Sequence, residues 1–131
     1  MSGPWDAEIK LLYPVDAGTF FTVDGIRSTT AFDAIANVEI GENLNENVDQ
    51  HDVWVAVRNL SKSTTIATGH GGGVLKPENN TPRREEIRIQ IASGWTADVG
   101  DLLELVASYK VTAGVNTTFS SRTSEKFVVD G

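Results

Sequence analysis

The strongest constraint on the fold is a hydrophobic pattern that repeats every second residue in five separate segments. In HDVWVAVRN, residues 51–59, the three valines Val53, Val55 and Val57 alternate with more polar neighbours. Successive side chains of a β-strand point to opposite faces, so such a segment has one apolar and one polar face. This pattern is typical of antiparallel sheets packed on one side. The other four segments are residues 7–15, 32–41, 85–93 and 102–111.

Shorter segments are predicted as weaker strands, separated by turns rich in Asp and Gly. Turns at VDAGT, VDGIR and DVGD and the loop KPENNTPRR contain the residues that turn conformations favour. The stretch TTAFDAIANVEI also places Phe32, Ile35 and Ala36 at helical spacing, but its alternation favours a strand. The polar face of that strand would carry Asp33 and Glu39. The weaker strands are residues 20–23, 64–68, 117–120 and 125–129.

The number and spacing of these strands favour one all-β domain. Seven to nine short strands in 131 residues are typical of an antiparallel β-sandwich with an immunoglobulin-like architecture. A closed β-barrel is the alternative. The length fits a single domain over residues 1–131, which is large enough to form a core without disulfide bonds. We expect almost no helix.

Two segments carry a family resemblance. DVWVAVRNL (residues 52–60) and the later DVGDLLELVASYKV (residues 98–111) resemble strands of prokaryotic immunoglobulin-like or fibronectin type III-like modules. The resemblance implies a β-sandwich. The chain departs from the pattern because it has no cysteine for an inter-sheet disulfide, and because Leu102, Leu103 and Leu105 stand where a tyrosine corner is expected. Such folds host many unrelated functions, so the resemblance implies architecture only.

Composition excludes several classes of function. Without cysteine, the chain has no thiolate nucleophile and no cysteine-ligated zinc. Eleven basic and 18 acidic residues give a net charge of -7, which disfavours binding to nucleic acid and to anionic membranes. No apolar run approaches the length of a transmembrane helix, so we expect no membrane insertion. The first nine residues, MSGPWDAEI, show no signal peptide.

The segment TGHGGGVL contains four glycines and a histidine within positions 69–73. HGGG has the form of an esterase oxyanion hole, but the chain lacks the G-x-S-x-G nucleophile elbow that this chemistry needs. A phosphate loop needs a following Lys-Ser or Lys-Thr and a helix, whereas Val74 and Leu75 follow here. We therefore predict an exposed, flexible hairpin tip at positions 69–73 with no catalytic role.

Neither the histidines nor the acidic segment has the spacing of a metal site. Three protein ligands are usual for a hydrolytic zinc, and the chain has only His51 and His70, which we expect to be independent surface residues. The segment GENLNENVDQHD is rich in the oxygen ligands that calcium takes. An EF-hand loop beginning at Asn43 would need Gly and Glu where Val48 and Trp54 stand. We predict no cofactor, with a looser calcium site as the alternative.

Neighbouring carboxylates do not form an obvious catalytic pair. Glu85 and Glu86 are adjacent on a predicted strand, so they should point to opposite faces. Asp98 and Asp101 enclose a glycine turn, and we expect them to stabilise it. A glycosidase would need two carboxylates at a set separation across a cleft. We predict no catalytic residue.

Trp54 is the residue that most strongly indicates a binding surface. If the valines on either side of it face the core, Trp54 lies on the opposite face with Asp52 and Arg58. An exposed aromatic on a flat sheet is suited to bind a sugar ring or a protein partner. The alternatives are that Trp54 itself faces the core or that residues 41–50 cover it. We predict Trp54 and Arg58 as the ligand-binding residues.

These observations predict a non-catalytic module for binding, adhesion or structure, with a protein or a carbohydrate as its partner. A carbohydrate-binding module and a self-assembling structural subunit are specific forms of this hypothesis, and a small hydrolase is the least favoured alternative. The sequence leaves the oligomeric state and the compartment open. A domain of a larger cell-surface or extracellular protein and a small stand-alone protein both fit.

Overall fold

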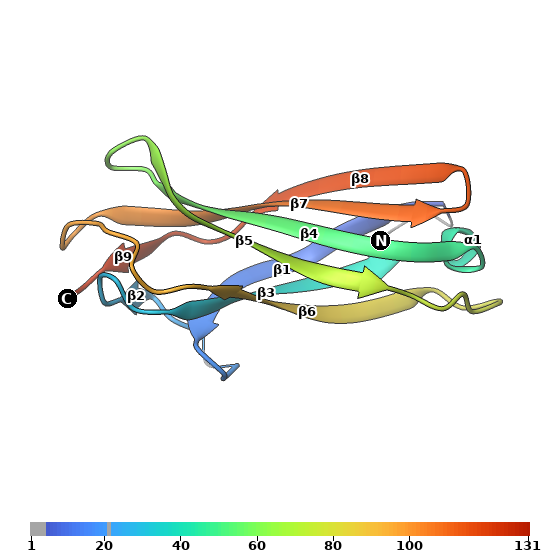
Figure 1. Ribbon diagram of the computed structural model, residues 1–131, viewed down its shortest axis with the longest axis horizontal. Helices are drawn as coiled ribbons and strands as arrows, with labels where there is room; N and C mark the ends of the chain where they lie inside the picture. Colours follow the sequence, from blue (N-terminus) through green and yellow to red (C-terminus); the bar gives the residue numbers. More distant parts are fainter. Residues whose placement is uncertain (1–4, 21) are drawn as a thin grey trace.

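Two β-sheets pack face to face in a computed structural model that describes residues 5–20 and 22–131 (Figure 1). Nine strands and one helical turn make up the regular structure of these residues. The elements are β1 (Ala7–Asp16), β2 (Gly25–Ile26), β3 (Phe32–Ile40), α1 (Glu42–Asn45), β4 (Val48–Asn59), β5 (Thr64–Val74), β6 (Arg83–Ile91), β7 (Leu102–Ala113), β8 (Asn116–Thr123) and β9 (Phe127–Val129).

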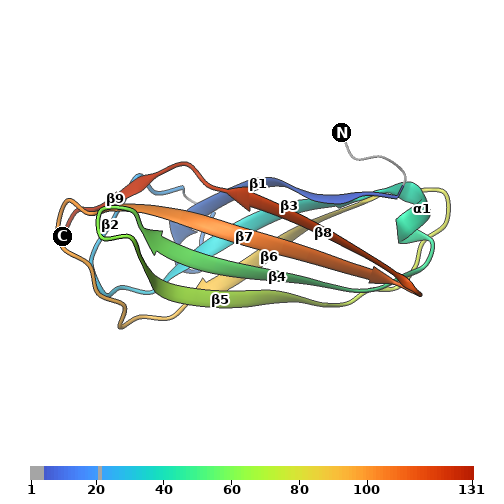
Figure 2. The same cartoon turned by 90° about the horizontal axis from the view of Figure 1, so that it is seen from above.

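The strand order is that of an immunoglobulin-like sandwich. The small sheet has the order β1-β3-β6, and all its pairs are antiparallel. The large sheet has the order β2-β9-β7-β4-β5, with β8 also paired to β7. Figure 2 shows β8, β7, β4 and β5 lying side by side across the large sheet. No strand of the described residues pairs across the two sheets, so the sandwich is not a closed barrel.

The five alternating segments correspond to the strands β1, β3, β4, β6 and β7, which confirms these predictions. Two weaker segments, 64–68 and 117–120, lie inside β5 and β8, and β9 lies inside the segment 125–129. The segment 20–23 is not a regular strand. Thr22 forms one isolated bridge with Val15, and Phe21 lies outside the described residues. The parallel pair β2–β9 was not predicted, because VDGIR was interpreted as a turn.

The short helix α1 was not predicted either. It makes one turn between β3 and β4, and Leu44 within it is buried in the core. The amide of Asn45 donates to the Thr81 carbonyl at 3.0 Å, and its oxygen accepts from Arg83 Nε at 2.8 Å. These bonds tie the loop before β6 to this end of the sandwich. No helix in residues 5–20 and 22–131 is long and apolar enough to span a membrane.

The core fills the space between the two inner faces. Alternation along β4 and β7 turns every second side chain inward, and the same holds for β3 and β6. At the end near β9, Phe32 packs edge-on against Trp95 and Phe127, with ring centroids 6.1 Å apart in each pair. The buried inner-face residues include Phe32, Ala34, Ala36, Val38, Ile40, Val53, Val55, Val57, Ile87, Ile89, Ile91, Leu103, Leu105, Ala107, Tyr109 and Val111.

The outer face of β3 is less exposed than its polar residues predicted. Asp33 and Glu39 are buried, 4% and 8% exposed, where a solvated face was expected. Asp33 forms an ion pair with Arg88 at 2.5 Å and accepts a hydrogen bond from the Gly18 amide at 2.9 Å. Glu39 pairs with Arg84 at 3.1 Å. The arginines of β6 and the loop after β1 therefore cover these carboxylates, which alternation along one strand does not reveal.

Candidate functional site

Trp54 lies on the outer face of the large sheet, in the orientation that alternation predicted. Val53, Val55 and Val57 are at most 2% exposed, whereas Trp54 is 45% exposed. Its neighbours on the same face of β4 are Asp52 and Ala56. The large sheet carries no layer of strands on this outer face (Figure 2), so the indole is accessible to a ligand.

Two cross-strand neighbours flank Trp54. His70 on β5 and Ser108 on β7 are its register partners. The rings of Trp54 and His70 have centroids 5.4 Å apart and are tilted by 46°. His70 Nε2 lies 2.9 Å from Asp52 Oδ1, and the same carboxylate group accepts from Gln50 Nε2 at 3.0 Å. The Asp52 carboxylate thus fixes the imidazole, and the imidazole supports one side of the indole.

Small side chains beside Trp54 leave a shallow hollow of about 550 Å³ on this face. Ala56 follows Trp54 on the same face, and its register partners are Thr68 on β5 and Val106 on β7. The hollow therefore has an aromatic wall, an apolar floor and hydroxyl groups at its rim. It is lined by Trp54, Val55, Ala56, Thr68, Gly69, His70, Val106 and Ser108.

Arg58, the second predicted ligand-binding residue, lies on the same face but does not line the hollow. It lies four positions after Trp54 along the strand, a distance of about 13 Å. Its guanidinium donates to the Thr65 hydroxyl at 2.6 Å. Trp54 and Arg58 thus share a surface without forming one contact site, and the structure adds His70, Thr68 and Ser108 to the residues beside the indole.

The glycine-rich segment is not a hairpin tip, which corrects the prediction. Residues 69–73 belong to β5 and pair along their length with β4, and the β4–β5 turn lies at residues 60–63. A Cβ on Gly69 would lie 2.7 Å from Ile89 Cγ2, and one on Gly72, where φ is +121°, would lie 2.2 Å from the His51 carbonyl oxygen. The glycines therefore allow β5 to approach β6 and β4 closely, which short turn motifs do not signal.

His51 is buried rather than on the surface, which corrects a second prediction. It is 5% exposed, and its Nδ1 shares a hydrogen bond of 2.8 Å with the hydroxyl of Tyr109. Burial lowers the pKa of His51 below its usual value and raises the pKa of Tyr109. His70 lies on the opposite face of the sheet, so the two histidines do not share a site.

The oxygens of the acidic segment, residues 41–52, bind separate partners. The Asp49 carboxylate accepts a hydrogen bond from the Gly114 backbone N–H at 2.8 Å, and the Glu46 carboxylate accepts one from the Asn80 backbone N–H at 3.4 Å. Asn45 binds Arg83, and Asp52 binds His70. In the part of the chain that the structure describes, no three His, Asp or Glu side chains are grouped to hold a metal ion. The absence of calcium binding stays a prediction.

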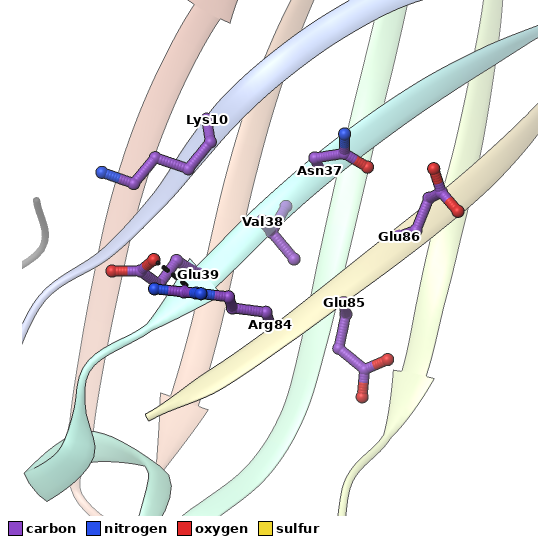
Figure 3. A pocket seen from close by; sticks show the side chains of 7 residues that line it. All are labelled: Lys10, Asn37, Val38, Glu39, Arg84, Glu85 and Glu86. Carbon is purple, nitrogen blue, oxygen red and sulfur yellow. Dashed lines mark hydrogen bonds and ion pairs between the residues drawn. The ribbon is translucent and has the colours of Figure 1, made fainter. Parts of the chain in front are cut away.

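A second hollow, of about 480 Å³, lies on the small sheet and is lined mainly by charged side chains (Figure 3). Arg84 and Glu39 form an ion pair across it at 3.1 Å. Glu85 and Glu86 point to opposite sides, as their adjacent positions predicted, and Glu85 pairs with Arg83 at 3.0 Å. Since Glu39 and Glu85 each pair with an arginine and Glu86 points away from Glu85, these carboxylates do not form a pair aimed at one point.

Asp98 and Asp101 stabilise the turn before β7, as expected. Asp101 accepts from the Asn59 amide at 2.8 Å, from the Asp98 backbone N–H at 3.0 Å and from Lys62 Nζ at 2.9 Å. These hydrogen bonds, that of Asn59 first, lower the pKa of Asp101 to about 2. The Lys62 ammonium also pairs with Asp98 at 2.8 Å. Both carboxylates therefore serve the fold.

Comparison with known proteins finds solved structures that resemble the chain at low sequence identity and with low TM-scores. No protein family and no curated protein matches the chain. A β-glucuronidase from glycoside hydrolase family 2 is 10% identical, with a TM-score of 0.49 over 94% of this chain and 12% of its own. BcpA, the major pilin subunit of Bacillus cereus, is 11% identical, with a TM-score of 0.48 over 90% of this chain and 39% of its own. The CooA pilin subunit from enterotoxigenic Escherichia coli is 10% identical, with a TM-score of 0.37 over 92% of this chain and 99% of its own.

The chain spans less than a fifth of the glycoside hydrolase family 2 proteins that it resembles, 12% and 15% in two of them. All these TM-scores lie below 0.5, and the identities are low. The similarities therefore decide nothing about the function of this chain. Its function has to be inferred from its own surfaces.

Proposed function

We propose that the chain is a non-catalytic carbohydrate-binding module that holds a neutral sugar ring against Trp54. The observation that carries this proposal is the half-exposed indole at the wall of a hollow on an otherwise uncovered sheet face. A sugar ring has apolar C–H faces and polar edges. The indole offers a flat apolar surface to such a face, and its contact with the His70 ring limits its motion.

The groups around the indole match the polar edge of a sugar. Thr68 and Ser108 provide hydroxyls that donate and accept hydrogen bonds, and the imidazole of His70 lies beside them. The Asp52 carboxylate is 14% exposed and is engaged by His70, so it orients the imidazole rather than repelling a ligand. The net charge of -7 favours a neutral sugar over an acidic one.

The dimensions of the hollow favour a small ligand over a protein. Its volume of about 550 Å³ falls in the range of small-molecule sites. A stable protein interface needs about 800 Å² on each partner, with several large anchors at its centre. Trp54 is the single large aromatic side chain in the lining of this hollow.

The remaining titratable groups support a non-catalytic function. His51 and Tyr109 bond to each other inside the core, and Asp101 holds a turn. These three groups, whose environments shift their pKa values, are thus engaged in the fold, away from the hollow beside Trp54. An enzyme would place such groups at the ligand.

Binding to an array of neutral oligosaccharides, followed by calorimetry, tests the proposal. Trp54→Ala should weaken binding of the selected oligosaccharide at least about tenfold, equivalent to about 1.4 kcal/mol. Trp5→Ala is the matched control, because Trp5 is also exposed, at 52%, but lies before β1. Circular dichroism would verify that both variants are folded. Equal binding by wild type and Trp54→Ala, or no binding to any neutral glycan, would contradict the proposal.

A further inference from the structure

We propose that copies of this chain assemble head to tail, with β5 of one copy pairing antiparallel to β8 of the next. β5 and β8 lie at opposite sides of the four long strands of the large sheet (Figure 2). Within the described residues, β5 pairs only with β4, and β8 pairs only with β7. An edge strand presents a row of backbone N–H and C=O groups that can pair with a further strand.

Both edges carry few of the features with which proteins usually prevent such pairing. β5 has the sequence TTIATGHGGGV, without Lys, Arg, Asp, Glu or Pro. β8 has the sequence NTTFSSRT, in which Arg122 is the only charged residue. The register of β5 with β4 is regular from Ala67 to Val74 and shifts once nearer its start, opposite Val57 and Arg58, whereas that of β8 with β7 is regular throughout. Charged side chains, prolines and bulges are the common forms of edge protection.

The edges of the small sheet provide an internal contrast. β1 contains Pro14 and charged residues, and its register shifts between Ile9 and Leu11. β6 has the sequence RREEIRIQI, with five charged side chains in its first six residues. Charged side chains thus mark both edges of the small sheet, whereas β5 carries none and β8 carries one.

Strand direction allows the two open edges to pair with each other. β4 is antiparallel to β5 and to β7, and β7 is antiparallel to β8, so β5 and β8 run in opposite directions. A second copy placed beside β5 in the same orientation therefore presents β8 as an antiparallel partner.

Apolar side chains near both edges also favour a second copy as the partner. Val74 on β5 is 83% exposed and Phe119 on β8 is 68% exposed, and both lie on the outer face. A two-fold dimer through β5 alone would leave the equally unprotected β8 open. Head-to-tail pairing uses both edges and, because it does not close on itself, produces chains of increasing length.

Sedimentation of the wild type and three double-lysine variants tests this arrangement. The β5 variant carries Thr64→Lys and Val74→Lys, and the β8 variant carries Thr117→Lys and Ser121→Lys. The control variant carries Gln50→Lys and Thr112→Lys, which place the same added charge on the two central strands. The mass of the wild type and of the control should rise with concentration, whereas the β5 and β8 variants should remain monomeric.

Mixing the two edge variants gives the sharpest result. Each variant keeps one intact edge, so an equimolar mixture should form a dimer of one β5 variant and one β8 variant and nothing larger. Single substitutions, Val74→Lys and Ser121→Lys, replace any double variant that fails to fold. A wild type that stays monomeric at its highest soluble concentration would overturn the proposal. So would loss of assembly in the control, or a β8 variant that assembles like the wild type.

Discussion

Replacement of Gly69 by alanine tests the role that the structure assigns to the glycines of β5. The added Cβ would lie 2.7 Å from Ile89 Cγ2, 2.9 Å from Ile91 Cδ1 and 3.1 Å from the Gln90 carbonyl oxygen. An ordinary contact begins at 3.4 Å, so the clearance falls short by about 0.7 Å at the Ile89 methyl and by about 0.3 Å at the Gln90 carbonyl, and β5 or the isoleucine side chains of β6 have to shift. The core side chains under the strand would lose contacts as it moves.

The expected effect on stability is the difference between two terms. Overpacking a well-filled core costs about 1–3 kcal/mol. Alanine also restricts the unfolded chain more than glycine does, which stabilises the fold by about 0.4–1 kcal/mol. We therefore expect Gly69→Ala to lower the free energy of unfolding by about 1–2 kcal/mol, in keeping with these ranges.

Urea denaturation measures this change as a lower midpoint at constant slope. Thr68→Val is the matched control, because Thr68 is exposed on the same strand and the substitution keeps a β-branched side chain. It should change stability by less than about 0.5 kcal/mol. If Gly69→Ala instead stabilised the protein, only the unfolded-state term would be acting, and the close packing of β5 against β6 would be refuted.

Three further predictions concern the buried His51–Tyr109 pair and calcium binding. Because burial lowers the pKa of His51, protonation is easier in the unfolded chain, so stability should fall as the pH drops from above 6.5 through the lowered pKa. Urea titrations across this range should show a smaller loss for His51→Gln, and an equal loss would exclude His51 as the cause. Tyr109→Phe leaves a buried His51 nitrogen without its partner, so it should cost about 1–3 kcal/mol in the same assay, and a neutral effect would contradict the hydrogen bond. Calcium in the millimolar range should leave the melting temperature unchanged, and a rise of several degrees that a chelator reverses would show a calcium site.

The sequence predicted the fold well where one face of a strand is apolar and the other is polar. The three valines around Trp54 placed the indole on the outer face because burying them excludes solvent from more apolar surface than burying the tryptophan with charged neighbours. The same rule failed for Asp33. Its carboxylate follows the polar pattern, yet Arg88, which is 55 positions away in the chain, covers and neutralises it.

The candidate site was predicted only at its centre, Trp54. His70 joins it through the register of β4 with β5, and Ser108 joins it through the register of β4 with β7. No local pattern encodes these pairings, because register depends on turns and on packing between sheets. The glycines misled the prediction for a related reason. Glycine serves both turns and close backbone approach, and only the position of β6 distinguishes the two.

A neutral sugar is expected to bind on the outer face of the large sheet, beside Trp54. Backbone amide shifts in an NMR titration with a neutral oligosaccharide selected on the array test it most directly. We expect the largest shifts at Trp54 and Ala56 on β4, at His70 on β5 and at Ser108 on β7, with the small sheet unaffected. Shifts concentrated around Glu39 and Arg84, in the charged hollow of the small sheet, would contradict the claim.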